Sequence, residues 1–434
     1  MNNYRILAEG KSISNNTFKT GLNNNDLIIG PSGAGKTGGY VIPNILQFNS
    51  SMIVADTKCN LYKKLSPALR MNGYDVHVVN FVDSKNSDSY NPLDYIPYDM
   101  ETNSFCEQDI VSIAHTLVPM LDSKDPFWEN AARTVVACLI AYVLEAFDYE
   151  DRNLCTVLEV FKAIMCIPVE QNIEAGITFL EEWALKRPDS FAAKKYKMFK
   201  GIITTDKTWP CILQFVSAAL DSFDFREARS IFCGQSDFRI EDLGRRKSVV
   251  FLNISDTDRS LDSLINIFYT QALQTLCREA DKNHDSKLKV PVRIIMDDFA
   301  TNAYVENFDK IISVIRSREI SVSIILQSMT KLETMYSPSA AATIVNNCDH
   351  VLYLGGSDIK TAEYIAEKSC KSVESILCME LNKAYLLCRG KNGELVDKIK
   401  PYSMNISETT QGKDDVDGSD IEELDLDYNK VPFF

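Results

Sequence analysis

The sequence predicts an α/β protein whose mostly parallel sheet is interrupted by an all-α insertion. Short apolar runs rich in Val and Ile recur near both ends of the 434-residue chain, as in strands covered on both faces. Helical stretches lie between several of these runs, and this alternation is typical of a helix-flanked parallel sheet. The middle of the chain, in contrast, has apolar residues at helical spacing only.

Eight apolar runs are predicted strands, most of them bounded by Gly, Asn or Asp. Three precede the insertion and five follow it, in the order 26–30, 51–56, 76–81, 248–255, 293–298, 321–327, 350–355 and 384–390. Between them, 262–279 and 306–316 have the apolar spacing of helices. The strands at both ends of the chain are therefore predicted to form one sheet.

The middle segment is too long for an ordinary crossover connection, which is the alternative interpretation of its helices. We predict four parts. Residues 1–100 form the first part of the core domain, 101–243 an all-α domain, 244–406 the second part of the core domain, and 407–434 a tail. The tail has nine acidic residues against two lysines, a composition that predicts a disordered segment or a docking segment for a partner.

Charge and cysteine usage exclude some functions. A net charge of −14 argues against a protein that coats DNA with a broad basic face, although contact through a few loops or a pore stays open. The twelve cysteines are scattered singly and the four histidines lie far apart. This pattern favours free thiols in a reducing cytosol over a Cys/His metal site.

No membrane-spanning segment is predicted. The N-terminus is polar, without the apolar core of a signal peptide. The most apolar long segment, Thr134–Phe147, has fourteen residues, which is too short to span a bilayer and fits a buried core helix. We therefore predict a cytoplasmic protein.

A phosphate-binding loop follows the first predicted strand. The residues Gly30, Pro31, Ser32, Gly33, Ala34, Gly35, Lys36 and Thr37 match G-x-x-x-x-G-K-[ST] in full. In such a loop the glycines let backbone N–H groups face an anion at a helix N-terminus, Lys36 reaches the β- and γ-phosphates, and Thr37 offers a hydroxyl to Mg²⁺. Pro43 predicts a kink or an early end of the following helix.

Acidic and amide side chains end two later strands. Asp297 is the candidate metal-supporting acid, and Asp298 the candidate base that orients an attacking water. Gln327 ends the next strand and is a candidate γ-phosphate sensor, because ligands bind at the carboxyl edge of parallel strands. Arg316 and Arg318 precede that strand, and either is a candidate arginine finger for a neighbouring subunit. For Asp297, Asp298 and Gln327 the alternative is a polar side chain that merely ends a strand. For Arg316 and Arg318 it is a solvated helix end.

The motif series as a whole resembles the type IV secretion-system coupling proteins, the TraG/TraD-type ATPases of bacterial conjugation. The shared segments include, in order, "GPSGAGKTGGYVIPNIL", "MIVADTK", "SYNPLDYI", "DPFWENAA", "MDDFAT", "IILQS" and "DHVLYLGG". They extend from about Leu27 to Arg389. The P-loop alone is generic, but its combination with "YNPLD" and "DPFW" is distinctive.

The resemblance implies a RecA-like P-loop NTPase core interrupted by an all-α domain. It also implies ATP and Mg²⁺ as cofactors, with Asp297 and Asp298 as the Walker B pair, Gln327 as the sensor and Arg316 as the preferred trans finger. Family members form homo-hexameric rings and deliver relaxase-bound single-stranded DNA to the proteins of a membrane channel. Whether the chain in isolation, without DNA or nucleotide, is a monomer stays open.

Three departures from the family pattern stand out. The second Walker B acid is usually Glu and is Asp298 here, so hydrolysis is expected to be slow or to need the assembled ring. Cys59-Asn60 stands where Gly-Glu is common after Asp56-x-Lys58. The N-terminal transmembrane segment of the family is missing, which predicts a soluble variant or a separate membrane anchor protein at the inner face of the membrane.

Two other functions stay open at this point. A HerA/FtsK-like DNA translocase would share the core fold, although the insertion and "YNPLD" favour the coupling protein. A nucleotide-dependent recruitment adaptor with weak hydrolysis is the non-motor alternative, and Asp298 motivates it.

Overall fold

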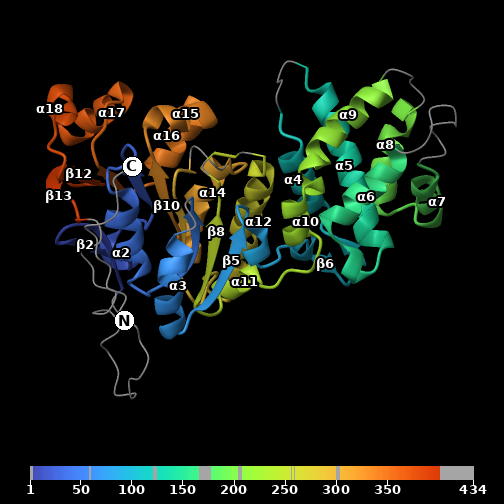
Figure 1. The fold of residues 1–434 in the computed structure, drawn as a ribbon, viewed down its shortest axis with the longest axis horizontal. Coiled ribbons are helices and arrows are strands. Elements are labelled where there is room, and N and C mark those ends of the chain that lie inside the picture. Colours follow the sequence, from blue (N-terminus) through green and yellow to red (C-terminus); the bar gives the residue numbers. More distant parts are fainter. Residues whose placement is uncertain are drawn as a thin grey trace.

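A nine-stranded sheet forms the central layer of one part of the molecule, on the left in Figure 1. The structure is a computed structural model that describes residues 3–57, 60–120, 125–165, 177–203, 208–255, 257–258, 260–299 and 304–400. From edge to edge the strands are β13 (Glu394–Asp397), β12 (Lys383–Cys388), β11 (His350–Tyr353), β3 (Asp26–Ile29), β10 (Ile320–Leu326), β9 (Val292–Met296), β4 (Ser51–Asp56), β8 (Ser248–Asn253) and β5 (Asp75–Asn80).

The sheet is mostly parallel, as predicted. All neighbours from β11 to β5 pair in parallel, and only β12 and β13 are antiparallel. The eight predicted strands all form. Strand β13 was not predicted, because three of its four side chains are exposed and an edge strand of this kind has no apolar run to mark it.

Helices cover both faces of the sheet. One face packs against the π-helical turn η1 (Thr37–Val41), α2 (Ile42–Ile45), α3 (Leu61–Met71) and the hairpin of β1 (Tyr4–Ala8) and β2 (Lys11–Ser14). The other face packs against α12 (Asp262–Asp281), α14 (Phe308–Val314), α15 (Met329–Met335), α16 (Pro338–Asn346) and α17 (Ile359–Ser369). The predicted helices 262–279 and 306–316 correspond to α12 and to α14 with its extension η7 (Ile315–Arg318). Smaller elements are α1 (Thr17–Thr20), α11 (Ile240–Leu243), α18 (Val373–Leu377) and η2 (Ser84–Asn86).

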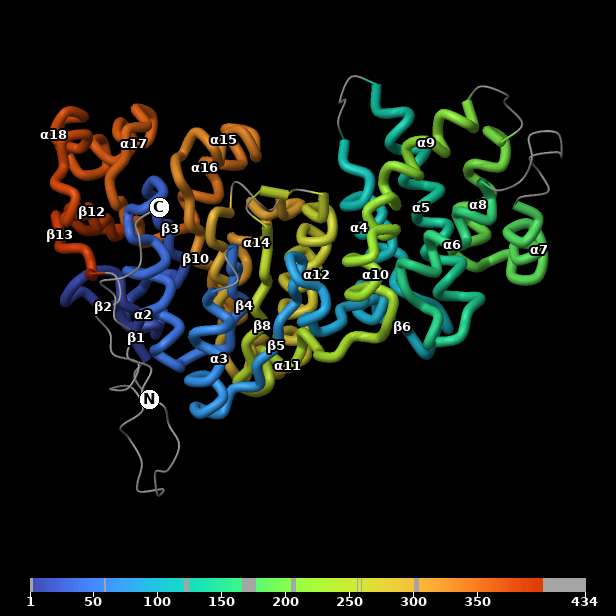
Figure 2. Tube along the Cα trace, viewed as in Figure 1, coloured from blue at the N-terminus to red at the C-terminus, as the bar shows by residue number. Residues whose placement is uncertain are grey.

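A second group of helices lies beside the sheet, next to the β5 edge (Figures 1 and 2). It consists of α4 (Glu107–Leu117), α5 (Phe127–Ala146), α6 (Leu154–Met165), α7 (Thr178–Lys186), α8 (Phe191–Ile203), α9 (Thr208–Leu220) and α10 (Arg226–Phe232), with short turns η4 (Tyr149–Asp151) and η6 (Asp221–Asp224). A two-stranded hairpin of β6 (Tyr98–Asp99) and β7 (Ser104–Phe105) begins this part of the chain. The predicted limits 101 and 243 stay predictions, and the acidic tail lies outside the described residues.

Helix α5 corrects one expectation. It has 20 residues and starts seven residues before the apolar run at Thr134, so by length and composition it could cross a membrane. The argument that this segment is too short is therefore wrong. The helix is nevertheless a core helix, because most of its residues are buried against α4, α6, α8 and α9.

The cysteines correct a second expectation. Cys155 in α6 and Cys233 after α10 form a disulfide rather than two free thiols. The two are separated by 78 residues in sequence and come together because α6 and α10 are neighbours in the helical group. Scattered single cysteines give no sequence signal for such a pairing.

An aromatic joint connects the sheet to the helical group. Tyr90 of the "YNPLD" segment is fully buried, and its ring contacts Phe232, Phe238 and Phe268. Its hydroxyl donates to Gln271 of α12, whose amide in turn donates 2.9 Å to the carbonyl of Pro92 at the start of η3 (Pro92–Tyr95). Beside the joint lies a cavity of about 720 Å³, which η3 lines together with the cationic side chains Arg152, Arg239, Arg278 and Lys282.

Candidate nucleotide site

The candidate site lies at the carboxyl ends of three adjacent strands. Gly30 follows β3, Gln327 follows β10 and Asp297 follows β9, and these strands are neighbours in the order β3-β10-β9. The sheet register therefore brings together residues that are separated by up to about 300 positions in sequence. This is the edge at which parallel α/β sheets bind ligands.

The loop after β3 has the backbone of an anion cradle. Gly33 and Gly35 have φ values of 78° and 92°, a region that side chains other than glycine rarely adopt. At Gly30 the constraint is space, since an added Cβ would lie 2.9 Å from Cβ of Leu354 on the loop after β11. Glycine is thus required at Gly33 and Gly35 by the backbone conformation and at Gly30 by close packing.

Lys36 is buried beneath the loop. Its ammonium donates to the carbonyls of Gly30 at 2.9 Å and Pro31 at 3.1 Å, and lies 3.9 Å from Oδ1 of Asp298. These contacts hold the charge inside the loop, where it can exchange the two carbonyls for phosphate oxygens.

Thr37 and Asp297 form the candidate metal site. The Thr37 hydroxyl donates to Oδ2 of Asp297 over 2.9 Å, and Asp297 is 6% exposed. Burial, and then the charge of Asp298, raise the pKa of Asp297 to about 6, against the opposing effects of Thr37 and Lys36. A hydroxyl and a carboxylate side by side are oxygen ligands of the kind that Mg²⁺ prefers, so this pair fits the ion.

Asp298 has an unusual backbone. Its φ is 50°, and its N–H donates 3.1 Å to Oδ1 of Asp297. Asp is one of the few residue types that are enriched in this left-handed region, so the local backbone is compatible with Asp where the resembling family usually has Glu. The turn directs the Asp298 carboxylate toward Lys36.

Gln327 contacts Asp298 and brings in a residue that was not predicted. The Gln327 amide donates 3.4 Å to Oδ1 of Asp298, while its own oxygen accepts a short hydrogen bond from Lys331. Lys331 is partly buried on α15, four residues after Gln327. Gln327 precedes this helix, so the i,i+4 pattern of helical pairs does not apply and gave no sequence signal for the contact.

The structure does not bring Arg316 to this site. Arg316 is exposed on η7, which precedes the amino end of β10, whereas Gln327 follows the carboxyl end of the same strand. The seven residues of β10 separate the two ends by roughly 23 Å. Arg318 is bound in two hydrogen bonds to Asp281, at 2.9 and 3.1 Å. A role for Arg316 in a neighbouring subunit stays a prediction.

The helix after the loop is irregular at the expected place. Pro43 lies at the start of α2, the turn before it is π-helical, and α2 ends at Ile45. Pro43 has no N–H to donate to the carbonyl of Gly39, so regular α-helical bonding cannot continue through this turn.

The remaining motif segments have structural contacts. Asp56 accepts hydrogen bonds from the N–H groups of Asn60 and Tyr62, at 3.1 and 3.0 Å, and so caps the start of α3. Lys58 and Cys59 lie outside the described residues. Trp128 of "DPFW" stacks on Phe215, with 6.5 Å between ring centroids.

Comparison with known proteins gives a consistent result. The sequence model of a family described as type IV secretory system conjugative DNA transfer matches residues 5–372. Protein VirD4 of Agrobacterium fabrum is 23% identical over 389 residues, which cover 82% of this chain and 52% of that protein. Protein VirD4 of Rhizobium radiobacter is 22% identical over 350 residues, covering 79% and 47%. The chain thus spans about half the length of the curated relatives it matches.

Solved structures share the fold. The bacterial conjugative coupling protein TrwBdeltaN70, in its unbound form, superposes with a TM-score of 0.63 at 14% identity, covering 86% of this chain and 84% of that chain. TrwB in complex with ADP and Mg²⁺ gives the same TM-score and identity, with 86% and 85% covered. VirB4 of Thermoanaerobacter pseudethanolicus gives 0.56 at 12% identity, with 93% and 98% covered. At these identities the likeness concerns the fold.

Proposed function

The chain belongs to the type IV secretory system conjugative DNA transfer family, and from that premise we propose that it is the ATPase coupling protein of a conjugative system. In this role it recruits relaxase-bound single-stranded DNA and drives its transfer to the membrane channel by ATP hydrolysis. TrwB has the same fold and has been solved in complex with ADP and Mg²⁺, which supports the assignment of ATP and Mg²⁺ as cofactors.

One observation carries the proposal: the 2.9 Å contact between the Thr37 hydroxyl and Asp297. The two residues are 260 positions apart. A P-loop hydroxyl and a strand-end carboxylate have this relation where they support the Mg²⁺ of a bound nucleotide. A glycine-rich turn without a nucleotide would not require a buried acid beside it.

Each side chain then has a specific task. Bound Mg²⁺ supplies charge to the β- and γ-phosphates, and Thr37 with Asp297 holds it. Lys36 releases the loop carbonyls and contacts the phosphates. Asp298 orients the attacking water, and Gln327 holds Asp298 through the 3.4 Å contact while Lys331 fixes the Gln327 amide. With its pKa at about 6, Asp297 is ionised at neutral pH and able to bind the cation.

The active form is a homo-hexamer in which Arg316 reaches the nucleotide of the neighbouring subunit. Two facts support Arg316 over Arg318: Arg316 is exposed, and Arg318 is held by Asp281. The protein acts at the inner face of the membrane, beside the channel proteins. With a net charge of −14, DNA contact is confined to a pore or a few loops.

The test measures ATP turnover of the purified chain, with and without single-stranded DNA, and conjugative transfer in cells. Lys36→Ala and Asp297→Asn should each abolish turnover and transfer. Lys310→Ala, which removes an exposed lysine that bonds to Asn307, is the matched control and should leave both unchanged. Transfer that is unaffected by Lys36→Ala would refute the proposal.

Other outcomes separate the competing functions. ATP binding without turnover under any condition would favour a recruitment adaptor. If DNA stimulates ATP turnover but deletion of the gene leaves conjugative transfer intact, an intracellular translocase of the HerA/FtsK kind would be favoured.

A further inference from the structure

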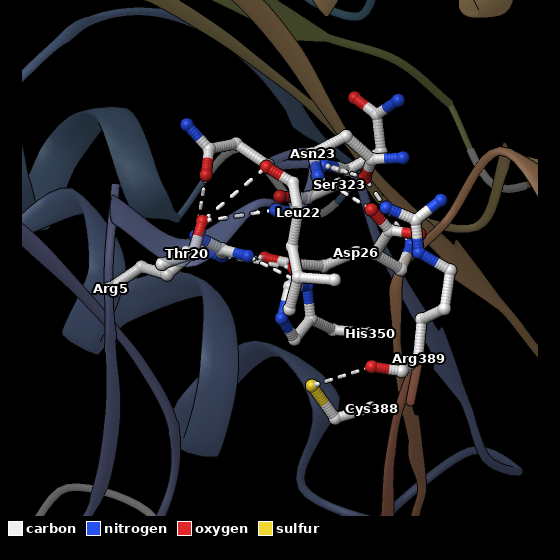
Figure 3. Close-up of polar contacts among 12 residues, drawn as sticks. Arg5, Thr20, Leu22, Asn23, Asp26, Ser323, His350, Cys388 and Arg389 are labelled. Carbon is white, nitrogen blue, oxygen red and sulfur yellow. Dashed lines mark hydrogen bonds and ion pairs between the residues drawn. The ribbon is translucent and has the colours of Figure 1, made fainter. Parts of the chain in front are cut away.

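A buried, charged cluster lies in the sheet toward the amino ends of the strands that carry the nucleotide site. Asp26, the first residue of β3, is 1% exposed. Its carboxylate accepts from Nε of Arg5 at 2.9 and 3.0 Å and from Nη1 of Arg293 at 3.3 Å, and lies 3.3 Å from Nδ1 of His350. Figure 3 shows Asp26 beside Arg5 and His350, which also contact each other at 2.7 Å between Nη2 and Nδ1.

The carboxylate in this cluster keeps its charge. Burial alone would raise the pKa of Asp26, but Arg5, His350 and Arg293 hold it well below its usual value. Removing a single charged partner from such a buried group is costly, because the remaining charge is left without compensation. The cluster therefore fixes the side chains of Arg5, Asp26 and Arg293 relative to one another.

Tyr40 connects the buried charged cluster to the helical turn that follows the P-loop. Its hydroxyl donates to Oδ2 of Asp26 over 2.6 Å and lies 2.8 Å from Oγ of Ser323 on β10. Ser323 in turn accepts from Nη1 of Arg293 at 3.0 Å, so it is free to donate to Tyr40. Burial and the adjacent Asp26 raise the pKa of the Tyr40 phenol far above neutral, so the hydroxyl remains a donor.

Tyr40 belongs to the π-helical turn that begins at Thr37. In that turn Ile42 donates to the carbonyl of Thr37, five residues back. The carbonyl of Tyr40 accepts instead from the side-chain amide of Asn44, at 2.8 Å. One α-helical bond remains in the turn, from the N–H of Gly39 to the carbonyl of Gly35 at 2.7 Å. At Tyr40 the turn is also held by side-chain contacts, through the hydroxyl and through the carbonyl.

The strands connect the buried charged cluster to the nucleotide site. Asp26, Arg293 and Ser323 each stand four residues before a site residue of their own strand, namely Gly30, Asp297 and Gln327. Four strand residues span roughly 13 Å. The side chains of Asp26, Ser323 and Arg293 therefore tie the three strands to one another on the amino side of the nucleotide site.

We propose that Tyr40 is a positioning residue that, through its bond to Asp26, sets the register of the π-helical turn and so holds Thr37 against Asp297. This inference rests on the proposed nucleotide function of the site. Tyr40 does not touch the nucleotide. It sets where the P-loop helix stands over the strands that carry Asp297 and Gln327.

The first test compares two buried tyrosines on the same face of the sheet. Tyr40→Phe keeps the ring and removes the hydroxyl. Tyr74→Phe is the matched control, because Tyr74 is also buried and its hydroxyl donates 2.8 Å to the carbonyl of Ser50, in contact with neither the P-loop nor Asp297. Binding of MgATP is measured by calorimetry and folding by thermal unfolding, both on the full chain.

We expect Tyr40→Phe to weaken MgATP binding by about tenfold or more, the size of one lost hydrogen bond to a charged group. Tyr74→Phe should bind like the wild type. If both variants bind MgATP like the wild type, or if both lose affinity to the same extent, the inference is refuted. A wild-type chain that binds no MgATP would overturn the proposed function and the inference together, so the two failures are distinguishable.

The second test asks whether Tyr40 acts through Thr37. In a Thr37→Ala background the residue to be positioned is missing, so Tyr40→Phe should weaken MgATP binding by less than about twofold. Non-additive effects of this kind indicate residues that work together. A full tenfold further loss would show that the two act independently, which would refute the positioning role.

Discussion

Replacement of Asp297 by Asn should stabilise the protein while abolishing turnover. Burial and the neighbouring Asp298 raise the pKa of Asp297 to about 6 in the folded state, from 3.8. The folded state therefore binds this proton more tightly than the unfolded state, and the charged carboxylate opposes folding as the pH rises between the two values. About two pKa units correspond to roughly 3 kcal/mol at pH 7.

The pH dependence gives this prediction its specificity. The gain from Asp297→Asn should fall from roughly 3 kcal/mol at pH 7 to below about 1 kcal/mol at pH 4, where the folded state keeps the proton and the unfolded state has regained a large part of it. Urea unfolding of wild type and variant at both pH values measures it. Asp358→Asn is a control of opposite sign, because hydrogen bonds from Thr361 and Thr330, despite burial, lower the pKa of Asp358. Equal or lower stability of Asp297→Asn at pH 7 would refute the reasoning.

Three further outcomes are expected. Lys331→Ala should lower kcat several-fold with little change in KM for ATP, because Lys331 fixes Gln327 rather than the nucleotide; a change in KM alone would contradict this. Reduction of the Cys155–Cys233 disulfide should cost about 4–5 kcal/mol of unfolding free energy, the chain-entropy value for a loop of this length, and peptide mapping without reductant should recover the linked pair. Tyr90→Ala should destabilise the folded chain by about 3–5 kcal/mol, the usual cost of emptying a buried aromatic site, as measured by urea unfolding.

The strands that carry the site could be predicted because their signals are local. Each is a short run of apolar side chains that ends in Gly, Asp or Gln, and the run alone marks it as covered on both faces. The P-loop is likewise a contiguous motif. Its relation to Asp297 and Gln327 followed from the rule that parallel strands present their carboxyl ends at one edge.

The buried cluster could not be predicted, because its signal is distributed over the chain. Arg5 is a single charged residue near the N-terminus, and its partners Asp26 and His350 are 21 and 345 positions away. Nothing in a short window distinguishes such an arginine from a solvated one, since burial of a charge depends on partners that only the fold supplies. The hairpin of β1 and β2, which carries Arg5, was likewise not predicted, because its contacts with the sheet are made by residues distant in sequence.

The helical group occupies the connection between two strands that are themselves neighbours, since β5 and β8 pair directly along six residues. Any chain that leaves β5 and returns to β8 satisfies the sheet, so no ladder hydrogen bond depends on how many helices are inserted. Selection can therefore lengthen, shorten or replace this connection while the nucleotide edge stays as it is. The contacts that join the two parts, such as the aromatic joint at Tyr90 and the ion pair between Arg278 and Asp109, must be inherited with the core. The helical group and the sheet that carries the candidate nucleotide site can in this way evolve at different rates.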